Sequence, residues 1–203
     1  PAQGQITPGE LIMKLLKLLA VFSLLSLLAA CGSTPRSDYY MLSAETQGTP
    51  GREGPSIGVG PVTVPDYLKR KEMVLNRSPN KLELADYHRW AETLDAGVLR
   101  VTAINLAALL ETQQVQTFPW RRASFPDYGV SIAVVQFSMK DTAALLVAEW
   151  TLTRPKSGEL ISQQISELSS QARGSEPEDV AAAYSALLEQ LAEKIASVVR
   201  QDS

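Results

Sequence analysis

The sequence predicts an α+β domain in which an antiparallel or mixed β-sheet carries two long helices packed on one face. Three observations predict this fold class. Apolar residues recur at helical spacing over residues 93–113 and again over residues 176–198. Between them, residues 130–168 contain three alternating runs separated by turn signals, as in an antiparallel meander. With 45% hydrophobic and 20% charged residues, the 203-residue chain can bury a core of this size.

The first element is an apolar segment near the N-terminus. Two lysines follow Met13, and residues 18–30 are then apolar except for two serines. This run is shorter than the roughly 20 residues that a membrane-spanning helix needs. A charged region followed by a short apolar region is typical of a signal peptide, so residues 13–30 are interpreted as one. Residues 1–12 precede the plausible start at Met13 and are interpreted as upstream or added sequence.

The signal segment closes with the letters LAACG at residues 28–32, which resemble the lipobox of bacterial lipoproteins. This resemblance implies cleavage before Cys31, diacylation of its thiol and acylation of the new amine. Three acyl chains would hold the protein on a membrane almost irreversibly, because each buried methylene contributes about 0.8 kcal/mol. The alternative is a core or anchor helix that happens to contain a cysteine. Gly32 and Ser33 lack the aspartate that resembles an inner-membrane retention signal, so the predicted location is the periplasmic face of the outer membrane.

A short stem is expected to follow the anchor. Residues 31–38 comprise the lipidated cysteine and small or polar residues, which suit a flexible linker. At roughly 3.3 Å per residue, this stem keeps the folded domain within about 25 Å of its anchor. Such a stem cannot cross the periplasm, so the domain acts near its own membrane or is met there by a longer partner. Residues 39–203 are predicted to form a single domain.

The N-terminal part of the domain is predicted to form four short strands. Their expected bounds are 39–42, 56–64, 73–76 and 81–87. Glycines and prolines over residues 46–55 indicate an exposed loop between the first two strands. In the second strand, Gly60 and Pro61 favour a bulge or a sheet edge.

The C-terminal part is predicted to contain a helix, a strand, the meander and a second helix. The first helix is expected over 93–113, followed by strands over 115–118, 130–134, 143–153 and 160–168. Ser175 and Glu178 have the spacing of a capping box, with Pro177 tolerated in the first turn. The second helix should therefore begin there and run for about six turns.

Composition and charge exclude several classes of protein. Nineteen basic and 22 acidic residues leave a net charge of -3, unlike the basic footprint of a nucleic-acid-binding protein. One cysteine and one histidine cannot build a tetrahedral zinc site by themselves. We therefore expect no nucleic-acid partner, no metal and no other cofactor.

The residues available for catalysis are few. His88 would have to be the base of any triad, and acylation of Cys31 would remove the thiol nucleophile. The sequence has no Gly-x-Ser-x-Gly elbow and no glycine-rich phosphate loop before a helix. The acidic residues near the start of the helix at residue 93 suit its dipole. The sequence thus predicts no catalytic residue and no enzyme, with His88 at the surface or at the end of a strand.

An unusual loop over residues 118–126 alternates aromatic and guanidinium groups between prolines. Trp120, Arg121 and Arg122 are candidate interface residues, because such a mixture suits a protein interface or anionic lipid headgroups. In the alternative interpretation, Trp120 and Phe118 pack into the core while the two arginines stay in solvent.

Four motifs occur in order along the chain behind the lipobox. They are YYML at residues 39–42, VTVPDYL at 62–68, RWAE at 89–92 and EW at 149–150, with LD and LR at 94–95 and 99–100. This arrangement resembles the PqiC family, the auxiliary lipoproteins of MCE-type intermembrane transport systems. The resemblance covers nearly the whole chain after the signal segment.

The resemblance implies a lipoprotein on the inner leaflet of the outer membrane. Its partner would be an MCE-domain protein that is anchored in the inner membrane and long enough to cross the periplasm. Phospholipid or other hydrophobic cargo would pass between the membranes, and this transport would support membrane integrity. The protein would serve as a non-catalytic docking component, and a homo-oligomer is expected.

Within the family motif, the candidate surface for a partner or for self-association comprises Val64, Pro65, Asp66, Tyr67 and Leu68. A proline that ends an edge strand would leave Tyr67 and Leu68 facing outward. The alternative is a turn fixed by Pro65, with Tyr67 packed under a helix.

Two other functions stay open on the sequence alone. One is an outer-membrane assembly lipoprotein that chaperones lipopolysaccharide or a β-barrel. In a partner pulldown, such a lipoprotein would bring down a β-barrel protein rather than an MCE-domain protein. The other is a periplasmic hydrolase, whose activity replacement of His88 should abolish.

Overall fold

The computed structural model describes residues 8–28, 35–45, 51, 54–78 and 80–203, which fall into two compact units. The units are Pro1–Arg36 and Ser37–Ser203. In the first unit, helix α1 (Pro8–Leu28) includes residues 18–28 of the apolar segment and begins before Met13. Within the described ranges, no helix has both the length and the apolar character needed to cross a membrane. Cys31 and the neighbouring residues 29–34 lie outside the described residues.

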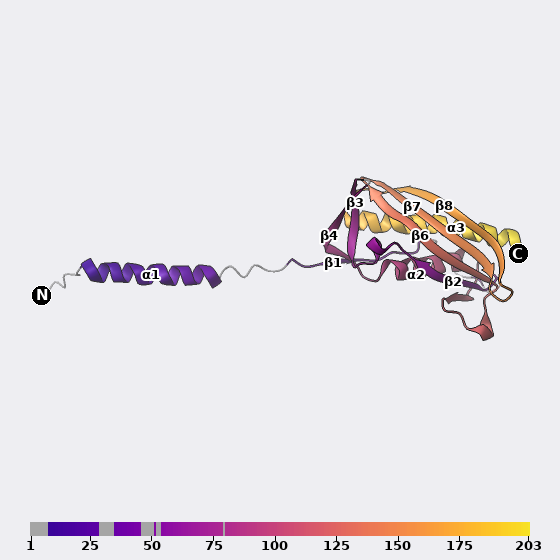
Figure 1. The fold of residues 1–203 in the computed structure, drawn as a ribbon, viewed down its shortest axis with the longest axis horizontal. Helices are drawn as coiled ribbons and strands as arrows, with labels where there is room; N and C mark the ends of the chain where they lie inside the picture. Colours follow the sequence, from indigo (N-terminus) through magenta and orange to yellow (C-terminus); the bar gives the residue numbers. More distant parts are fainter. Residues whose placement is uncertain (1–7, 29–34, 46–50, 52–53, 79) are drawn as a thin grey trace. The chain divides into compact units, whose positions relative to one another are not determined.

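The second unit, residues 37–203, is built on a five-stranded mixed sheet (Figure 1). The strands are β2 (Ile57–Thr63), β5 (Val115–Thr117), β6 (Tyr128–Lys140), β7 (Ala143–Arg154) and β8 (Glu159–Gln171). Their order is β5-β2-β6-β7-β8. β6, β7 and β8 form the predicted antiparallel meander, whereas β2 pairs in parallel with both β5 and β6. The predicted α+β class is confirmed.

A smaller sheet holds the other predicted strands. It consists of β1 (Asp38–Tyr40), β3 (Glu72–Ser78) and β4 (Lys81–Trp90) in the order β1-β4-β3. β3 and β4 form an antiparallel hairpin, and β1 pairs in parallel with the far end of β4. All four N-terminal strands are therefore present, but only β2 belongs to the large sheet.

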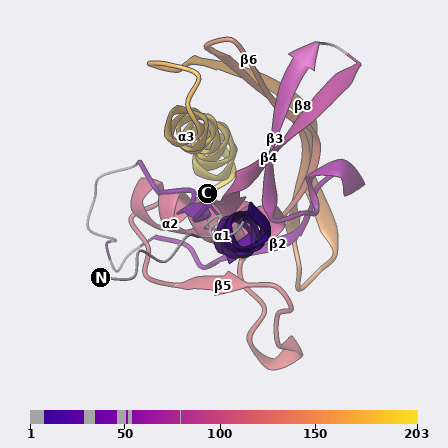
Figure 2. The same ribbon diagram turned by 90° about the vertical axis from the view of Figure 1, so that its left-hand side faces the viewer.

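Two helices, α2 (Leu94–Leu109) and α3 (Pro177–Asp202), pack against each other and against one face of the large sheet (Figure 2). α2 ends four residues earlier than predicted, just before Glu111, which adopts a left-handed φ of 50°. α3 begins after a capping box formed by Glu176 and Asp179, one residue later than predicted.

The core lies between the helices and the sheet. The central part of α3 contributes three leucines that are fully buried, Leu187, Leu188 and Leu191. From the sheet, Phe137 stacks on Tyr184 of α3 with ring centroids 3.8 Å apart. Burial raises the pKa of Tyr184 far above its usual value. This interior accounts for the long apolar stripe in α3.

Three register shifts interrupt the large sheet, one of them between β7 and β8 at Leu152 and Thr153. The register of β2 against β6 shifts between Val59 and Val62, which confirms the bulge predicted at Gly60. Gly60 has a φ of 111°, a conformation that favours glycine. A second bulge in β6 turns Val135 outward, where it is 55% exposed.

Candidate functional site

The residues that the structure describes bring together no group of three metal-ligating side chains. His88 lies on β4, where its Nδ1 is 3.0 Å from the hydroxyl of Tyr40 and 4.0 Å from a carboxylate oxygen of Asp38. Both neighbours come from β1, which pairs with β4 at this position. His88 therefore takes part in the contact between these two strands.

The candidate segment 64–68 forms a tight turn. Its residues Asp66–Leu68 are a short 3-10 helix, η1, in which the Leu68 N–H donates to the Pro65 carbonyl at 2.9 Å. Lys69 donates to the Asp66 carboxylate at 2.8 Å, and this hydrogen bond lowers the pKa of Asp66. The structure therefore shows a turn at Pro65, which is the turn of the alternative interpretation.

The expected outward direction of Leu68 is wrong. Val64 and Leu68 are only 5% and 4% exposed and belong to the core. Tyr67 is half-buried, and this burial raises the pKa of its hydroxyl against the effect of a hydrogen bond with the Phe137 backbone. The 3-10 turn swings Leu68 back beneath the strand end, so Asp66 is the fully exposed member of the segment.

The aromatic loop over residues 118–126 lies between β5 and β6. Phe118 is 48% exposed and packs edge-on against Trp120, with ring centroids 5.6 Å apart. Arg121 is exposed and precedes a short 3-10 helix, η2 (Arg122–Ser124). The side chain of Arg122 is not among those that the structure describes.

Trp120 rests on the outer face of the large sheet, because two glycines leave room for its ring. Gly58 and Gly129 are cross-strand partners on β2 and β6. A Cβ at Gly58 would lie 2.5 Å from Cε2 of Trp120, and one at Gly129 would lie 2.7 Å from Cη2. The indole Nε1 is buried and has no hydrogen-bond partner among the described residues. The glycine pair thus fixes the base of the loop, while Phe118 and Arg121 stay accessible.

A prediction follows for this contact. Gly58→Ala should displace Trp120, since the new methyl group occupies the space of the ring, and should destabilise the fold by about 1–3 kcal/mol through overpacking. The measurement is a red shift of tryptophan emission together with faster proteolysis within residues 118–126. Trp120→Phe in the same background is the control, because it removes the reporting indole and leaves Trp90 and Trp150 buried. Unchanged emission in Gly58→Ala would contradict the contact.

The end of the loop is held to β2 by Asp127. Its carboxylate accepts hydrogen bonds from the hydroxyl and the backbone N–H of Ser56, at 2.6 and 3.0 Å. These bonds lower the pKa of Asp127. The loop is therefore held at both ends and at Trp120, while Phe118 and Arg121 stay exposed.

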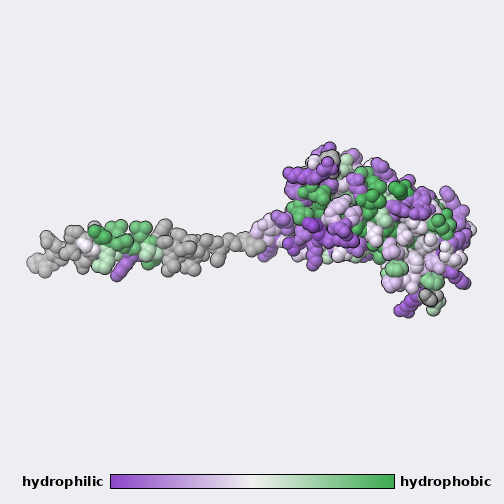
Figure 3. Space-filling view, viewed as in Figure 1, coloured by the Kyte–Doolittle hydropathy of each residue, from purple (hydrophilic) through white to green (hydrophobic). Residues whose placement is uncertain are grey.

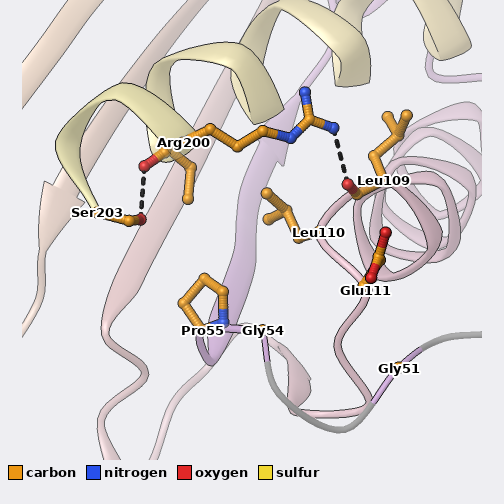
Figure 4. A pocket seen from close by; sticks show the side chains of 9 residues that line it. Gly51, Gly54, Pro55, Leu109, Leu110, Glu111, Arg200 and Ser203 are labelled. Carbon is orange, nitrogen blue, oxygen red and sulfur yellow. Dashed lines mark hydrogen bonds between the residues drawn. The ribbon is translucent and has the colours of Figure 1, made fainter.

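A hollow of about 550 Å³ lies where α2 and α3 end (Figure 4). Leu109, Leu110 and Val199 form its apolar wall. The Arg200 guanidinium donates to the Leu109 carbonyl at 2.7 Å and so caps the last turn of α2. This guanidinium is engaged in joining the two helix ends, and we assign no ligand to the hollow.

A second arginine joins two motifs that lie apart in the sequence. The Arg100 side chain on α2 donates to the Glu92 carboxylate at 3.0 and 2.5 Å and to the Leu42 carbonyl at 2.8 Å. It therefore links the chain after β1, the residues after β4, and α2. These residues belong to the family motifs, but the sequence alone indicates no contact between them.

The sequence and the fold are similar to those of known proteins. The family model described as "ABC-type transport auxiliary lipoprotein component" matches residues 40–196. The intermembrane transport lipoprotein PqiC of Escherichia coli (strain K12) is 30% identical over 139 residues, which cover 66% of this chain and 72% of PqiC.

The chain belongs to the ABC-type transport auxiliary lipoprotein family.

The PqiC-family resemblance seen in the sequence is thereby confirmed. The fold of this auxiliary lipoprotein also matches a Xanthomonas campestris protein of known crystal structure, with a TM-score of 0.67 at 14% identity. That match covers 82% of this chain and 98% of the other. A second crystal structure, of an uncharacterized protein, has a TM-score of 0.65 at 20% identity over 83% of this chain and all of the other. Both likenesses concern the fold alone.

Proposed function

We propose that this auxiliary lipoprotein is anchored through Cys31 to the periplasmic face of the outer membrane and receives a periplasm-spanning MCE-domain protein there. It acts without catalysis, as one subunit of a homo-oligomer, and the complex passes phospholipid or other hydrophobic cargo between the membranes. Membership of a transport auxiliary family is the observation that carries the proposal. The relation to an intermembrane transport lipoprotein supports the intermembrane setting.

The geometry of residues 37–203 suggests which surface meets the partner. The first turns of α3 lie beside β1, because Glu178 and Ala181 line the same surface hollow as Tyr40. At its other end, Asp202 accepts a hydrogen bond from Tyr128, the residue that begins β6 after the aromatic loop. A helix of 26 residues is about 39 Å long. β1 and the aromatic loop are therefore at opposite ends of residues 37–203 (Figure 1).

This separation favours the aromatic loop as the partner surface. If the stem holds the β1 end near the membrane, Phe118 and Arg121 face the periplasm, from which a longer partner would arrive. Exposed aromatic and arginine side chains are enriched at protein interfaces. The segment 64–68 is a weaker candidate, because Val64 and Leu68 are buried.

Site-specific photo-crosslinking in living cells tests the proposal. A photoreactive residue replaces Phe118, and the matched control replaces Ile165 on β8, which is 70% exposed. We expect Phe118 to give an adduct that mass spectrometry identifies as an MCE-domain protein, with at least tenfold less from Ile165. An adduct with a β-barrel protein, or equal adducts from both positions, would contradict the proposed function.

A further inference from the structure

The outermost strand β8 leaves one edge of the large sheet open (Figure 1). Beside the end of β8, the Ala172 N–H donates to the Thr142 carbonyl at 2.8 Å. Because backbone groups alternate in direction along an antiparallel strand, those of Gln163, Ile165 and Glu167 point away from β7. Among the described residues, none forms a backbone hydrogen bond with these three on that side. An edge with free carbonyl and N–H groups can bind a partner.

The surface beside this edge is acidic. β7 and β8 together contain three glutamates and one arginine. The arginine, Arg154, ends β7 and is paired with Glu159 at 3.5 Å. The middle of the two strands therefore has Glu149 and Glu167 but no cation, and we call these two glutamates and the open side of β8 the acidic edge. Ile165, the register partner of Glu149, is 70% exposed, and Figure 3 shows hydrophobic side chains among hydrophilic ones over the large sheet.

The same chain carries a complementary basic segment. Three exposed cations in a row follow the turn η1, and we call Lys69, Arg70 and Lys71 the basic segment. The acidic residues on either side of it are already paired, Asp66 with Lys69 at 2.8 Å and Glu72 with a guanidinium at 3.9 Å. Arg70 and Lys71 form no ion pair within the part of the chain that the structure describes. Their charges are therefore available to another molecule.

The basic segment and the acidic edge lie at similar heights along the strands. A row of register partners crosses the large sheet, and it comprises Thr63, Ala133, Glu149 and Ile165. β2 ends at Thr63, and the chain continues from there into η1 and the basic segment. In the sheet order, β6 and β7 separate β2 from β8. The two surfaces are thus apart across the sheet but level along it.

We propose that the acidic edge of one copy binds the basic segment of a second copy of this chain. The inference rests on the homo-oligomer of the proposed function and names its contact. Arg70 and Lys71 of the second copy lie against Glu149 and Glu167, and their N–H groups donate to the open carbonyls of β8. The aliphatic stem of Lys71 covers Ile165.

The anchor favours this contact over a pairing of β8 with itself. A contact between two different surfaces is heterologous, and its repetition gives a ring when the rotation closes. Because the two surfaces are level, copies related by an axis parallel to the strands keep all β1 ends toward one membrane and all aromatic loops away from it. A two-fold pairing of β8 with β8 is antiparallel, so it would place the two β1 ends at opposite ends of the pair.

Photo-crosslinking and charge reversal in living cells test the contact. A photoreactive residue at Ile165 should give a self-adduct of twice the subunit mass, and its crosslinked peptide should contain the basic segment. Arg70→Glu with Lys71→Glu should lower this self-adduct at least tenfold, as should Glu149→Lys with Glu167→Lys. The four changes together should restore it to within threefold of the original, because the charges of the two surfaces match again.

A matched control reverses two other cations. Lys81→Glu with Lys140→Glu changes the net charge equally at exposed residues outside the basic segment, and should leave the self-adduct within twofold. A crosslinked peptide from β8 itself would overturn the inference without any charge variant. Charge reversals that leave the self-adduct unchanged, or a fourfold variant that fails to restore it, would also overturn it.

The proposed docking is measured in the same cells by the adduct between Phe118 and the MCE-domain protein. The self-adduct from Ile165 differs from that adduct in mass. Loss of the self-adduct while the Phe118 adduct persists would overturn the contact between copies alone. Loss of the Phe118 adduct while the self-adduct persists would overturn the docking alone.

Discussion

Cys31→Ala should abolish the incorporation of palmitate and remove the protein from the outer-membrane fraction. The chain has one cysteine, so no second thiol can accept the lipid in its place. A single acyl chain gives only marginal, reversible binding, whereas three chains at one residue hold almost irreversibly. The expected change is therefore nearly complete rather than partial. Metabolic labelling with palmitate and density-gradient fractionation of the envelope measure it.

Gly32→Asp is the matched control for the membrane to which the protein is sorted. This variant keeps the acylated cysteine and adds the aspartate that resembles an inner-membrane retention signal. It should retain palmitate and shift to the inner-membrane fraction. An unmodified Cys31 thiol in the mature wild-type protein, seen by mass spectrometry, would contradict the anchor itself.

The elements with the strongest local signals were predicted well. The stripe from Val180 to Val198 predicts α3, because its apolar residues are buried or partly buried in the core. The meander was also predictable from its periodicity. Every second residue of a strand points to the same face, and Leu146, Ala148 and Trp150 on β7 all face the core. A periodic pattern indicates which side chains face the core, and it can be recognised without knowing which distant residues they contact.

The features that the sequence did not specify depend on contacts between residues far apart in the chain. Leu68 was expected to face outward, yet a 3-10 turn returns it to the core. Trp120 lies on the outer face of the sheet because Gly58 and Gly129 become neighbours only after β2 pairs with β6. Such features follow from which strands meet, and a single sequence does not specify that pairing.

Trp150→Ala should destabilise the domain more than any surface substitution. Trp150 is 1% exposed in the middle of β7, and its Nε1 donates to the Ser166 hydroxyl on β8 at 3.0 Å. Truncating a buried tryptophan leaves a cavity and costs about 3–5 kcal/mol. Small domains are stable by only about 5–15 kcal/mol, so the loss is a large share of the total. Chemical denaturation measured by circular dichroism would show the lowered midpoint.

A double-mutant cycle separates the packing of the Trp150 ring from its hydrogen bond. Ser166→Ala leaves the buried Nε1 without its partner and should cost about 1–3 kcal/mol, whereas Trp150→Phe removes the donor and part of the ring. In the double variant, Ser166→Ala should cost less than it does alone, because the donor is already gone. Additive costs would mean that the bond contributes nothing to stability. In that case packing alone would hold β7 and β8 in register against α3, and the polar pair could be replaced without loss.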